Sequence, residues 1–359
     1  MTHVCVIGYI TNKTRTEWDV AMDVELDADD ALALLASLRR MGLVGADEVP
    51  RLTPLTGGVS SQIVRADTAR GTVCIKRALA QLKVAAQWLA PLERNAAEVA
   101  WMKFASTLVP GFVPQIIAED QTARAFAMAY LNPENYRVWK DELLGGIAET
   151  VTARQLGARL AAIHQASAGK DELARTFAND ASFFALRLEP YLLATAAANP
   201  DCAAELIRLS EDTAATKRAL VHGDVSPKNI LVGSGGPVLL DAECAWYGDP
   251  AFDVAFCLNH LLLKCLWRPE ATERFLACFD ALNDAYFAGV AWESPADVEA
   301  RAARLLPALM LARVDGKSPV EYLNTPEDRA RVRNFTKPFI VDPPKTLDAI
   351  RHRWNKELT

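Results

Sequence analysis

The sequence predicts an α+β fold in two lobes, with a small antiparallel-sheet lobe over residues 1–131 and a large, mostly helical lobe over residues 132–359. Three observations predict this fold. Short apolar runs of strand length are separated by turn residues in the first lobe. Apolar residues recur at helical spacing through most of the later chain. A polar loop between two apolar runs, within residues 221–243, interrupts that helical part.

The composition limits the class of protein. The chain has 359 residues, 51% of them hydrophobic, which is enough for a sizeable core. A formal net charge of -6 and a pI near 5.5 give no support for nucleic-acid binding, which usually requires a basic face. The seven cysteines include no Cys-x-x-Cys pair, so we expect free thiols in a reducing cytoplasm. The longest apolar stretch, Val254 to Trp267, contains Asn259, His260 and Lys264 and is too short and too polar to cross a membrane.

The first lobe is expected to begin with a helix, after residues 1–25, which carry no chemical signal. Ala28 to Met41 has helical spacing, with Asp27 as a cap and Gly42 as a stop. A helix that starts at Pro91 and runs over Leu92 to Phe104 separates two groups of strands. The predicted strands are Val49–Leu55, Val59–Ala66, Thr72–Arg77, Pro114–Ala118 and Arg124–Tyr130.

The second lobe is expected to be helical on both sides of the polar loop. Val151 to Ser167 places Leu156, Leu160 and Ile163 on one face, and we assign no role to His164 on this helix. Further helices are expected near 181–195 and 201–217, at 254–267, over Ala296–Val314 and over Pro319–Leu323. Pro307 should kink or split the helix that contains it. Ser294-Pro295 and Ser318-Pro319 each resemble a cap followed by a first-turn proline.

The polar loop carries the strongest chemical signal of the chain. It reads His222-Gly223-Asp224-Val225-Ser226-Pro227-Lys228-Asn229, followed by strand Ile230–Leu231–Val232, the turn 233–236, strand Val238–Leu239–Leu240, and Asp241-Ala242-Glu243. Phosphoryl transfer needs one carboxylate to accept the proton of a hydroxyl, and an Asn and an Asp to hold magnesium against ATP phosphates. Asp224, Asn229 and Asp241 have that spacing. The alternative is a structural hairpin, since Asp, Asn and Gly often terminate strands.

His-Gly-Asp-x-x-x-x-Asn followed by an apolar strand and Asp resembles the catalytic loop of the aminoglycoside phosphotransferase and choline kinase group, from about Leu52 onward. The resemblance implies a protein kinase-like fold that uses ATP and Mg²⁺. It makes Asp224 the catalytic base, Asn229 and Asp241 the metal ligands, and Glu243 a further metal ligand or a residue beside one. Lys228 would help to neutralise the γ-phosphate, or is a solvated loop lysine. An Asp at the position of Asp253 would brace the catalytic loop by accepting backbone N–H bonds.

The same resemblance gives roles to residues of the first lobe. The turn with Gly57, Gly58 and Ser60 would cover the ATP phosphates, although two glycines between strands are more often only a hairpin turn. Lys76 would bind the α- and β-phosphates and pair with a Glu of the next helix, where Glu98 is preferred to Glu93. The strand end with Met128 and Tyr130, before Asn132-Pro133, would contact adenine at a hinge near residue 131.

The acceptor is less well defined than the reaction. The loop lacks the Arg of protein kinases and no Ala-Pro-Glu follows, so we expect a small-molecule hydroxyl acceptor rather than a protein. Asp241-x-Glu243, followed by Tyr247-Gly248 and Phe252-Asp253, resembles 5-methylthioribose kinase, whereas Ser226-Pro227-Lys228 departs from it. Two other acceptor classes stay open, an aminoglycoside and a choline- or homoserine-type alcohol. A catalytically weak nucleotide-binding scaffold is the alternative function, and a homodimer is a possible assembly. The resemblance places the acceptor near later helices, where Leu311–Gly316 supplies Arg313 and Asp315 as candidate contacts.

Overall fold

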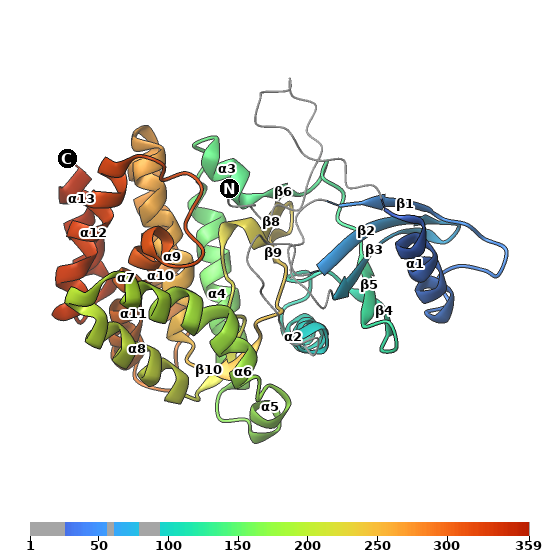
Figure 1. Cartoon of the computed structure of the whole chain (residues 1–359), viewed down its shortest axis with the longest axis horizontal. Helices are drawn as coiled ribbons and strands as arrows, with labels where there is room; N and C mark the ends of the chain where they lie inside the picture. The colour runs from blue at the N-terminus through green and yellow to red at the C-terminus, as the bar shows by residue number, and fades with distance from the viewer. Residues whose placement is uncertain (1–25, 56–60, 79–93, 359) are drawn as a thin grey trace.

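The computed structural model describes residues 26–55, 61–78 and 94–358, and it has the predicted α+β fold of a sheet-containing lobe followed by a larger helical lobe (Figure 1). The first lobe contains a five-stranded antiparallel sheet in the order β1-β2-β3-β5-β4. Its strands are β1 (Arg51–Pro54), β2 (Ser61–Thr68), β3 (Gly71–Ala78), β4 (Ile116–Asp120) and β5 (Ala125–Ala129). All five predicted strands are therefore present, with ends shifted by a few residues.

Alternation of side chains along β3 gives the sheet two different faces. Val73 and Ile75 point to one face, where they pack against Leu34 and Leu38 of α1 (Ala28–Arg40). Cys74 belongs to the main core on the other face, and Lys76, two residues further along the strand, points to the same face as Cys74. The strand sequence thus directs Lys76 away from α1 and toward the helical lobe.

The predicted N-terminus of α1 is confirmed in atomic detail. Asp27 is its N-cap and accepts a hydrogen bond of 2.7 Å from the backbone N–H of Asp30, which satisfies one of the free donors of the first turn. Gly42 follows the helix with φ of +69°, a left-handed conformation that glycine adopts at little cost. The helix ends at Arg40, one residue before the predicted end.

The second lobe is organised around helices that enclose two small sheets. The antiparallel order β6-β8-β9 joins β6 (Arg137–Val138), β8 (Ile230–Gly233) and β9 (Gly236–Leu239), while β7 (Ala219–Val221) pairs with β10 (Trp246–Gly248). The predicted hairpin is confirmed, with a tighter turn because Gly233 and Gly236 both belong to strands. After β5 the chain continues to β6, which pairs with β8 of this hairpin. The lobe boundary near residue 131 stays a prediction.

The helices of the two lobes follow the predicted periodicity closely. α2 (Arg94–Leu108) lies between the sheet and the helical lobe in Figure 1. The second lobe contains α3 (Trp139–Leu144), α4 (Thr150–Ser167), α5 (Asp171–Thr176), α6 (Asp180–Phe183), α7 (Ala194–Ala198), α8 (Ala203–Ala215), α9 (Ala251–Trp267), α10 (Thr272–Phe287), α11 (Pro295–Asp315), α12 (Pro326–Val341) and α13 (Leu347–Leu358). Short segments η1 (Phe184–Leu193, π-helical) and the 3₁₀ turns η2 (Pro200–Cys202), η3 (Pro227–Asn229) and η4 (Pro269–Ala271) complete it.

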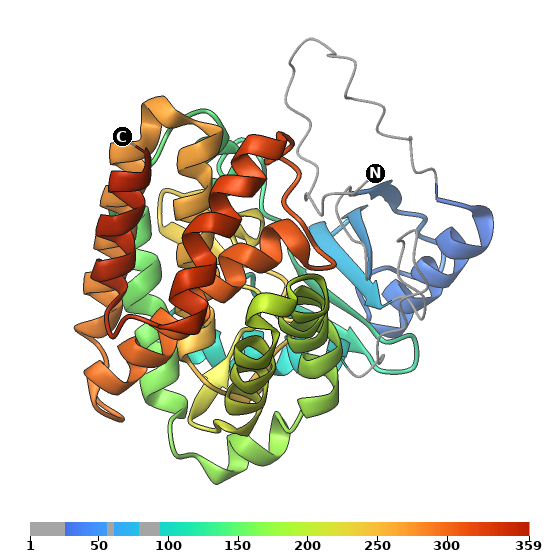
Figure 2. The same ribbon diagram turned by 60° about the vertical axis from the view of Figure 1, so that its left-hand side comes forward.

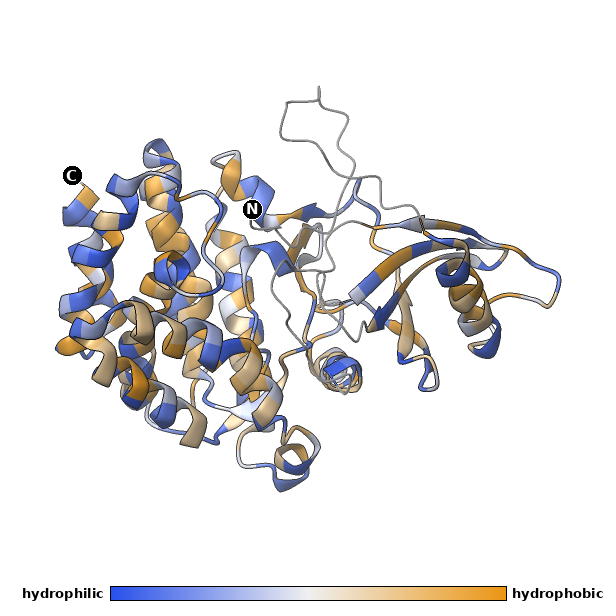
Figure 3. Cartoon of the chain, in the orientation of Figure 1, coloured by the Kyte–Doolittle hydropathy of each residue, from blue (hydrophilic) through white to orange (hydrophobic). Residues whose placement is uncertain are grey.

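Helix α9 forms the centre of the helical lobe. Its residues from Ala251 to Cys265 are all buried, because apolar side chains surround the helix on every side. Figure 3 shows this concentration of hydrophobic residues along α9. Helices α10, α11 and α13 pack against it, and α12 packs on α11. In Figure 1 the red C-terminal helices lie on the side away from the sheet, and in Figure 2 the helix that ends at the C-terminus keeps that position.

In the C-terminal region the structure excludes one of the two outcomes predicted for Pro307, and it contradicts one predicted helix. Helix α11 runs unbroken through Pro307, which does not split it; the residue is buried, and packing against α9 holds the helix together despite the missing N–H donor. Pro319 to Leu323 is not a helix, so Ser318 does not cap one. This segment instead folds back along α11, because the Val320 N–H donates to the Arg313 carbonyl at 2.8 Å. At Ser294-Pro295 the predicted first-turn proline is present.

Six cysteines are described; all are buried free thiols. Among residues 26–55, 61–78 and 94–358, no helix combines the length and the apolar character needed to cross a membrane.

Candidate active site

The predicted catalytic loop, residues 222–229, connects β7 to β8 and is held by a buried carboxylate of α9. Asp253 accepts hydrogen bonds from the backbone N–H groups of His222 and Gly223, both at 2.8 Å. Its side chain is completely buried, and bonds to an ionised acceptor each contribute about 1.5–3 kcal/mol. The predicted bracing contact of Asp253 is therefore confirmed.

His164, to which sequence analysis gave no role, contacts the Asp253 carboxylate. Its Nε2 lies 3.3 Å from Asp253 Oδ2 and its Nδ1 lies 2.9 Å from the hydroxyl of Tyr286 on α10. One imidazole thus connects three helices, α4, α9 and α10. The only local signal was a polar residue in an otherwise apolar helical pattern, and its partners are 89 and 122 residues away in sequence.

Gly223 is required by the geometry of the loop. It adopts φ of +79°, and a Cβ atom there would lie 2.7 Å from the Cys244 carbonyl oxygen. Any other residue would have to displace the backbone of the segment that follows Asp241. The His-Gly-Asp motif thus contains glycine because the two chemically important segments approach too closely for a side chain.

Asp224 is buried between two cations. Its Oδ2 lies 2.9 Å from Arg187 Nη2 and 3.4 Å from Lys228 Nζ, and its side chain is 5% exposed. Burial alone opposes ionisation, but Arg187 and then Lys228 overcome it and hold the pKa of the Asp224 carboxyl well below its usual range. Asp224 is therefore a carboxylate at neutral pH.

Arg187 was missed by sequence reasoning. It lies on the π-helical segment η1, and it also donates from Nε to the Gly223 carbonyl at 2.5 Å and from Nη1 to the Leu186 carbonyl at 2.6 Å. π-Helical turns often occur at functional sites because they redirect a side chain. The available signal was a charged residue inside the apolar run Phe184–Leu193, whose partner in the loop is 36 residues away.

On the other side of the site, Lys76 connects the two lobes. Its Nζ lies 2.7 Å from Glu98 Oε2 on α2 and 2.5 Å from Asp241 Oδ1, which is 165 residues away in sequence. The predicted pairing with Glu98 is confirmed, while Glu93 lies outside the described residues. Burial disfavours the charged Lys76, but Asp241 and Glu98 raise its pKa well above the ordinary value. For Glu98, burial outweighs the attraction of Lys76, so its pKa is raised.

Asp241 occupies an unusual backbone conformation. Its φ is +67°, in the left-handed region that residues other than glycine rarely adopt. The Leu240 N–H donates to the Asn229 carbonyl at 2.8 Å, so the end of the hairpin is tied to the catalytic loop just before this residue. Such conformations persist where surrounding contacts enforce them, and they concentrate at functional sites.

Asn229 of the loop and Asp241 after the hairpin offer oxygen atoms of the kind that Mg²⁺ binds. Asn229 donates from Nδ2 to the Asp224 carbonyl at 3.1 Å, so its amide oxygen is the atom that could coordinate a cation. Mg²⁺ commonly takes one or two protein carboxylates and completes its shell with phosphate oxygens and water, which matches Asp241 and Asn229. Glu243 lies 3.2 Å from Arg94 Nε. Among the described residues no group of three or more His, Cys, Asp or Glu side chains is arranged to hold a metal.

The predicted nucleotide contacts of the first lobe are only partly described. Met128 of β5 is paired with Cys74 of β3, so it shares the sheet face of Lys76. Tyr130 follows β5, with the Arg65 guanidinium 4.9 Å from its ring centre. Gly57, Gly58 and Ser60 lie outside the described residues. The roles of these five residues stay predictions.

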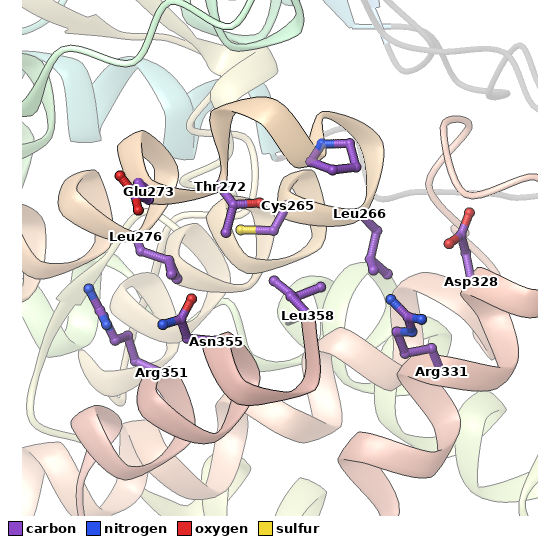
Figure 4. A pocket seen from close by; sticks show the side chains of 11 residues that line it. Cys265, Leu266, Thr272, Glu273, Leu276, Asp328, Arg331, Arg351, Asn355 and Leu358 are labelled. Carbon is purple, nitrogen blue, oxygen red and sulfur yellow. The ribbon is translucent and has the colours of Figure 1, made fainter.

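A separate cavity of about 590 Å³ lies at the far end of α9 (Figure 4). Its lining includes Cys265 and Leu266 of α9, Arg331 of α12, and Arg351 and Asn355 of α13. None of the described site residues named above lines it, so this cavity is not part of the predicted active site.

Comparison with known proteins agrees with this geometry. Residues 51–296 match the phosphotransferase enzyme family model. The chain is 26% identical over 223 residues to methylthioribose kinase of Cronobacter sakazakii and 26% identical over 255 residues to that of Geobacillus thermodenitrificans. These matches cover 55% and 62% of this chain and 55% and 61% of the relatives, so the chain spans little more than half of their length.

The fold is also found among solved structures. The amicoumacin kinase hAmiN, in complex with AMP-PNP, Ca²⁺ and Ami, aligns with a TM-score of 0.52 over 86% of this chain and 94% of its own, at 14% identity. At that identity the likeness concerns the fold alone. The family match, in contrast, extends over more than half of the chain and includes the catalytic loop, Lys76 and Asp253, and the chain therefore belongs to the phosphotransferase enzyme family.

Proposed function

We propose that this protein transfers the γ-phosphate of ATP to a hydroxyl group of a small molecule. One observation carries the proposal. Lys76 of the sheet lobe contacts Asp241 of the helical lobe, and the neighbouring loop holds Asp224 as a buried carboxylate. Phosphoryl transfer requires mainly positioning and charge neutralisation, and this arrangement supplies both.

In this proposal Asp224 orients the acceptor hydroxyl and accepts its proton. The low pKa of the Asp224 carboxyl makes it a weak base, so its main contribution is to hold the hydroxyl for attack. A strong base is unnecessary where the transition state is loose and the proton leaves late. Arg187 keeps the carboxylate ionised and in place, and Lys228 neutralises charge on the transferred phosphoryl group.

The nucleotide is proposed to bind on the Lys76 side. Lys76 binds the α- and β-phosphates and Glu98 positions it. Asn229 and Asp241 form the proposed metal side, where a bound Mg²⁺ would neutralise phosphate charge. Glu243, which pairs with Arg94, is a further metal ligand or a residue beside one. The adenine contacts (Met128, Tyr130) and the phosphate-covering turn (Gly57, Gly58, Ser60) complete the proposed nucleotide site.

The acceptor is proposed to be a small hydroxyl compound of the sugar class. The relatives named methylthioribose kinase favour a sugar. Aminoglycosides and choline- or homoserine-type alcohols remain alternatives. Asp315, a predicted acceptor contact, binds Arg333 of α12 at 2.6 Å, and its acceptor role stays a prediction. The cytoplasmic location and a homodimer also remain predictions.

The test is ADP release in the presence of Mg-ATP and a panel of acceptors. Methylthioribose, kanamycin, choline, homoserine and a generic protein substrate cover the alternatives. We expect turnover with at least one small molecule and none with the protein. Mg-dependent ATP binding without ADP release for any compound would favour the catalytically weak scaffold. Efficient phosphorylation of the protein alone would contradict the proposed function.

A further inference from the structure

Three basic side chains of α9 and α11 form a buried group that we call the basic cluster: His260, Lys264 and Arg313. His260 and Lys264 are one helical turn apart on α9, and Arg313 lies in the last turn of α11, which packs against α9. Their exposed fractions are 6%, 1% and 9%. Lys and Arg are rarely this buried unless they are paired, so the group needs an explanation.

Each member of the basic cluster has a buried nitrogen without a hydrogen-bond partner among the described residues. These atoms are Nε2 of His260, Nζ of Lys264 and Nε of Arg313. Arg313 uses Nη1 to donate to the hydroxyls of Tyr191 and Ser318, both at 3.0 Å. A buried donor left unpaired destabilises the fold by about 1–3 kcal/mol, and more if it is charged. Three such atoms together are not expected from packing alone.

The surroundings of Lys264 do not neutralise it. Its Nζ lies 4.5 Å from the centre of the Trp267 ring and 4.6 Å from that of Tyr322. These aromatic faces attract a cation but cannot accept all of its N–H groups. Among the described residues, no carboxylate lies within 4.0 Å of the Lys264 ammonium. Glu321 is nearby, but it is paired with Lys140. Asp141 and Arg313 also contribute to its electrostatic environment.

The basic cluster is continuous with the catalytic loop. Arg187, which pairs with Asp224, has its guanidinium carbon 5.7 Å from the centre of the Phe256 ring and 5.8 Å from that of Tyr191. The His260 ring lies 5.8 Å from the same Phe256 ring, and Arg313 lies 5.6 Å from the same Tyr191 ring. Two shared aromatic rings thus join Asp224 to the cluster. Ser226 of the loop adds a further buried hydroxyl without a described partner.

We propose that the acceptor carries an anionic group, a carboxylate or a phosphate, that binds at the basic cluster while its hydroxyl lies at Asp224. The inference rests on the proposed function and specifies its acceptor. An anion would provide the acceptors that the Lys264 and Arg313 nitrogens lack, in charge-assisted bonds that are roughly twice as strong as neutral ones. Burial and the neighbouring Arg313 and Lys264 lower the pKa of His260, so its neutral ring would donate to the anion in the tautomer that carries hydrogen on Nε2. A polycationic aminoglycoside would meet like charge at the same place, which disfavours that alternative.

The experiment compares acceptors on one scaffold. Ribitol, ribonate and ribitol 5-phosphate differ in charge but share an acyclic polyhydroxylated chain, and kanamycin serves as the polycation. We expect kcat/KM, measured by ADP release, to be at least about tenfold higher for one of the anions than for ribitol. Ribonate and ribitol 5-phosphate distinguish a carboxylate from a phosphate. Calorimetry with AMP-PNP present measures the same preference without turnover.

Variants connect the preference to the basic cluster. Lys264→Met should abolish the advantage of the anion over ribitol and leave Mg-ATP affinity unchanged. Arg313→Gln, which keeps a donor toward Tyr191, should have the same effect. The matched control is Lys337→Met on α12, whose ammonium pairs with Asp201 and which should retain the wild-type preference.

The outcomes separate this inference from the proposed function. Absence of both Mg-dependent ATP binding and ADP release would overturn the proposed function itself. ATP binding with a preference for ribitol or kanamycin, or with no preference in turnover or calorimetry, would overturn only the anionic acceptor. An anion preference that survives in Lys264→Met and Arg313→Gln would assign the anion to another site and also overturn the inference.

Discussion

The proposed nucleotide side and the proposed acceptor side of the site surround a buried lysine in opposite ways. On the nucleotide side, Lys76 has two carboxylates, Glu98 and Asp241, within hydrogen-bond distance. On the acceptor side, Lys264 is equally buried but has two aromatic rings and no described hydrogen-bond acceptor. The first arrangement is complete within the protein, whereas the second lacks a counter-charge.

The presence or absence of carboxylate partners indicates a different role for each buried lysine. A paired cation holds the two lobes in register before any ligand arrives, which is a form of preorganisation. An unpaired buried cation destabilises the folded chain and is expected where a ligand supplies the missing charge. The four changes below test this contrast, from the largest expected effect to the smallest.

The largest effect is expected at Asp224, which belongs to both sides. Asp224→Asn preserves the shape of the side chain but removes its charge and its ability to take a proton. We expect kcat to fall by about 10²–10⁴-fold while the affinity for Mg-ATP changes little. Steady-state ADP release and calorimetry measure the two quantities. Near-normal turnover in the variant would remove Asp224 from the mechanism.

Asp241→Asn should affect the nucleotide side alone. A neutral amide coordinates Mg²⁺ less well than a carboxylate, so we expect Mg-dependent ATP affinity to fall about tenfold or more. Affinity measured in EDTA should change much less. Lys264→Met is the matched comparison, because it should leave both affinities at wild-type values. An unchanged magnesium dependence in Asp241→Asn would contradict the proposed metal ligand.

Lys264 should make stability depend on pH. Burial, followed by Lys140, lowers its pKa from the ordinary 10.5 to about 7, with Glu321 and Asp141 acting in the opposite direction. Between these two pH values the unfolded chain binds the proton and the folded chain does not, so this group makes stability rise with pH. At pH 7 Lys264→Met should unfold about 2–4 °C higher than the wild type.

The pH series provides the check on that result. The advantage of Lys264→Met should shrink as the pH is raised from 7 toward 10, because the wild-type chain must release a proton on folding and this release becomes easier as the pH approaches the ordinary lysine pKa. Thermal unfolding at several pH values measures the difference. A constant or growing advantage would show that Lys264 is not a destabilising buried cation, whereas Lys337→Met should show no such trend.

The smallest effect is expected at Glu243. Its carboxylate already interacts with Arg94, so it is less available to a metal than Asp241. Glu243→Gln keeps an oxygen toward Arg94, and we expect Mg-dependent ATP affinity to fall less than tenfold (about 1 kcal/mol). Calorimetry against the Asp241→Asn variant gives the ranking. An equal or larger loss at Glu243 would make it a direct metal ligand.

Local sequence patterns predicted those features whose causes lie within a few residues. The short apolar run before Lys76 placed this residue on a strand, and a cap with helical periodicity located α1. The order of polar residues around one hairpin identified Asp224, Asn229 and Asp241. The prediction failed at Pro319–Leu323, where the proline suggested a helix start but a backbone bond to Arg313 in α11 decided the conformation.

The sequence alone therefore determined the class of fold, the position of the candidate catalytic loop and the family, because these depend on short-range periodicity and on a contiguous motif. Only the tertiary structure decided which charges meet: Arg187 with Asp224, His164 with Asp253, and Lys76 with a carboxylate 165 residues away. The physical reason is that ion pairing and burial depend on distances through space, which the packing of α9 against its neighbours sets. The same packing leaves the nitrogens of His260, Lys264 and Arg313 without described partners, and no local pattern could have identified that deficit.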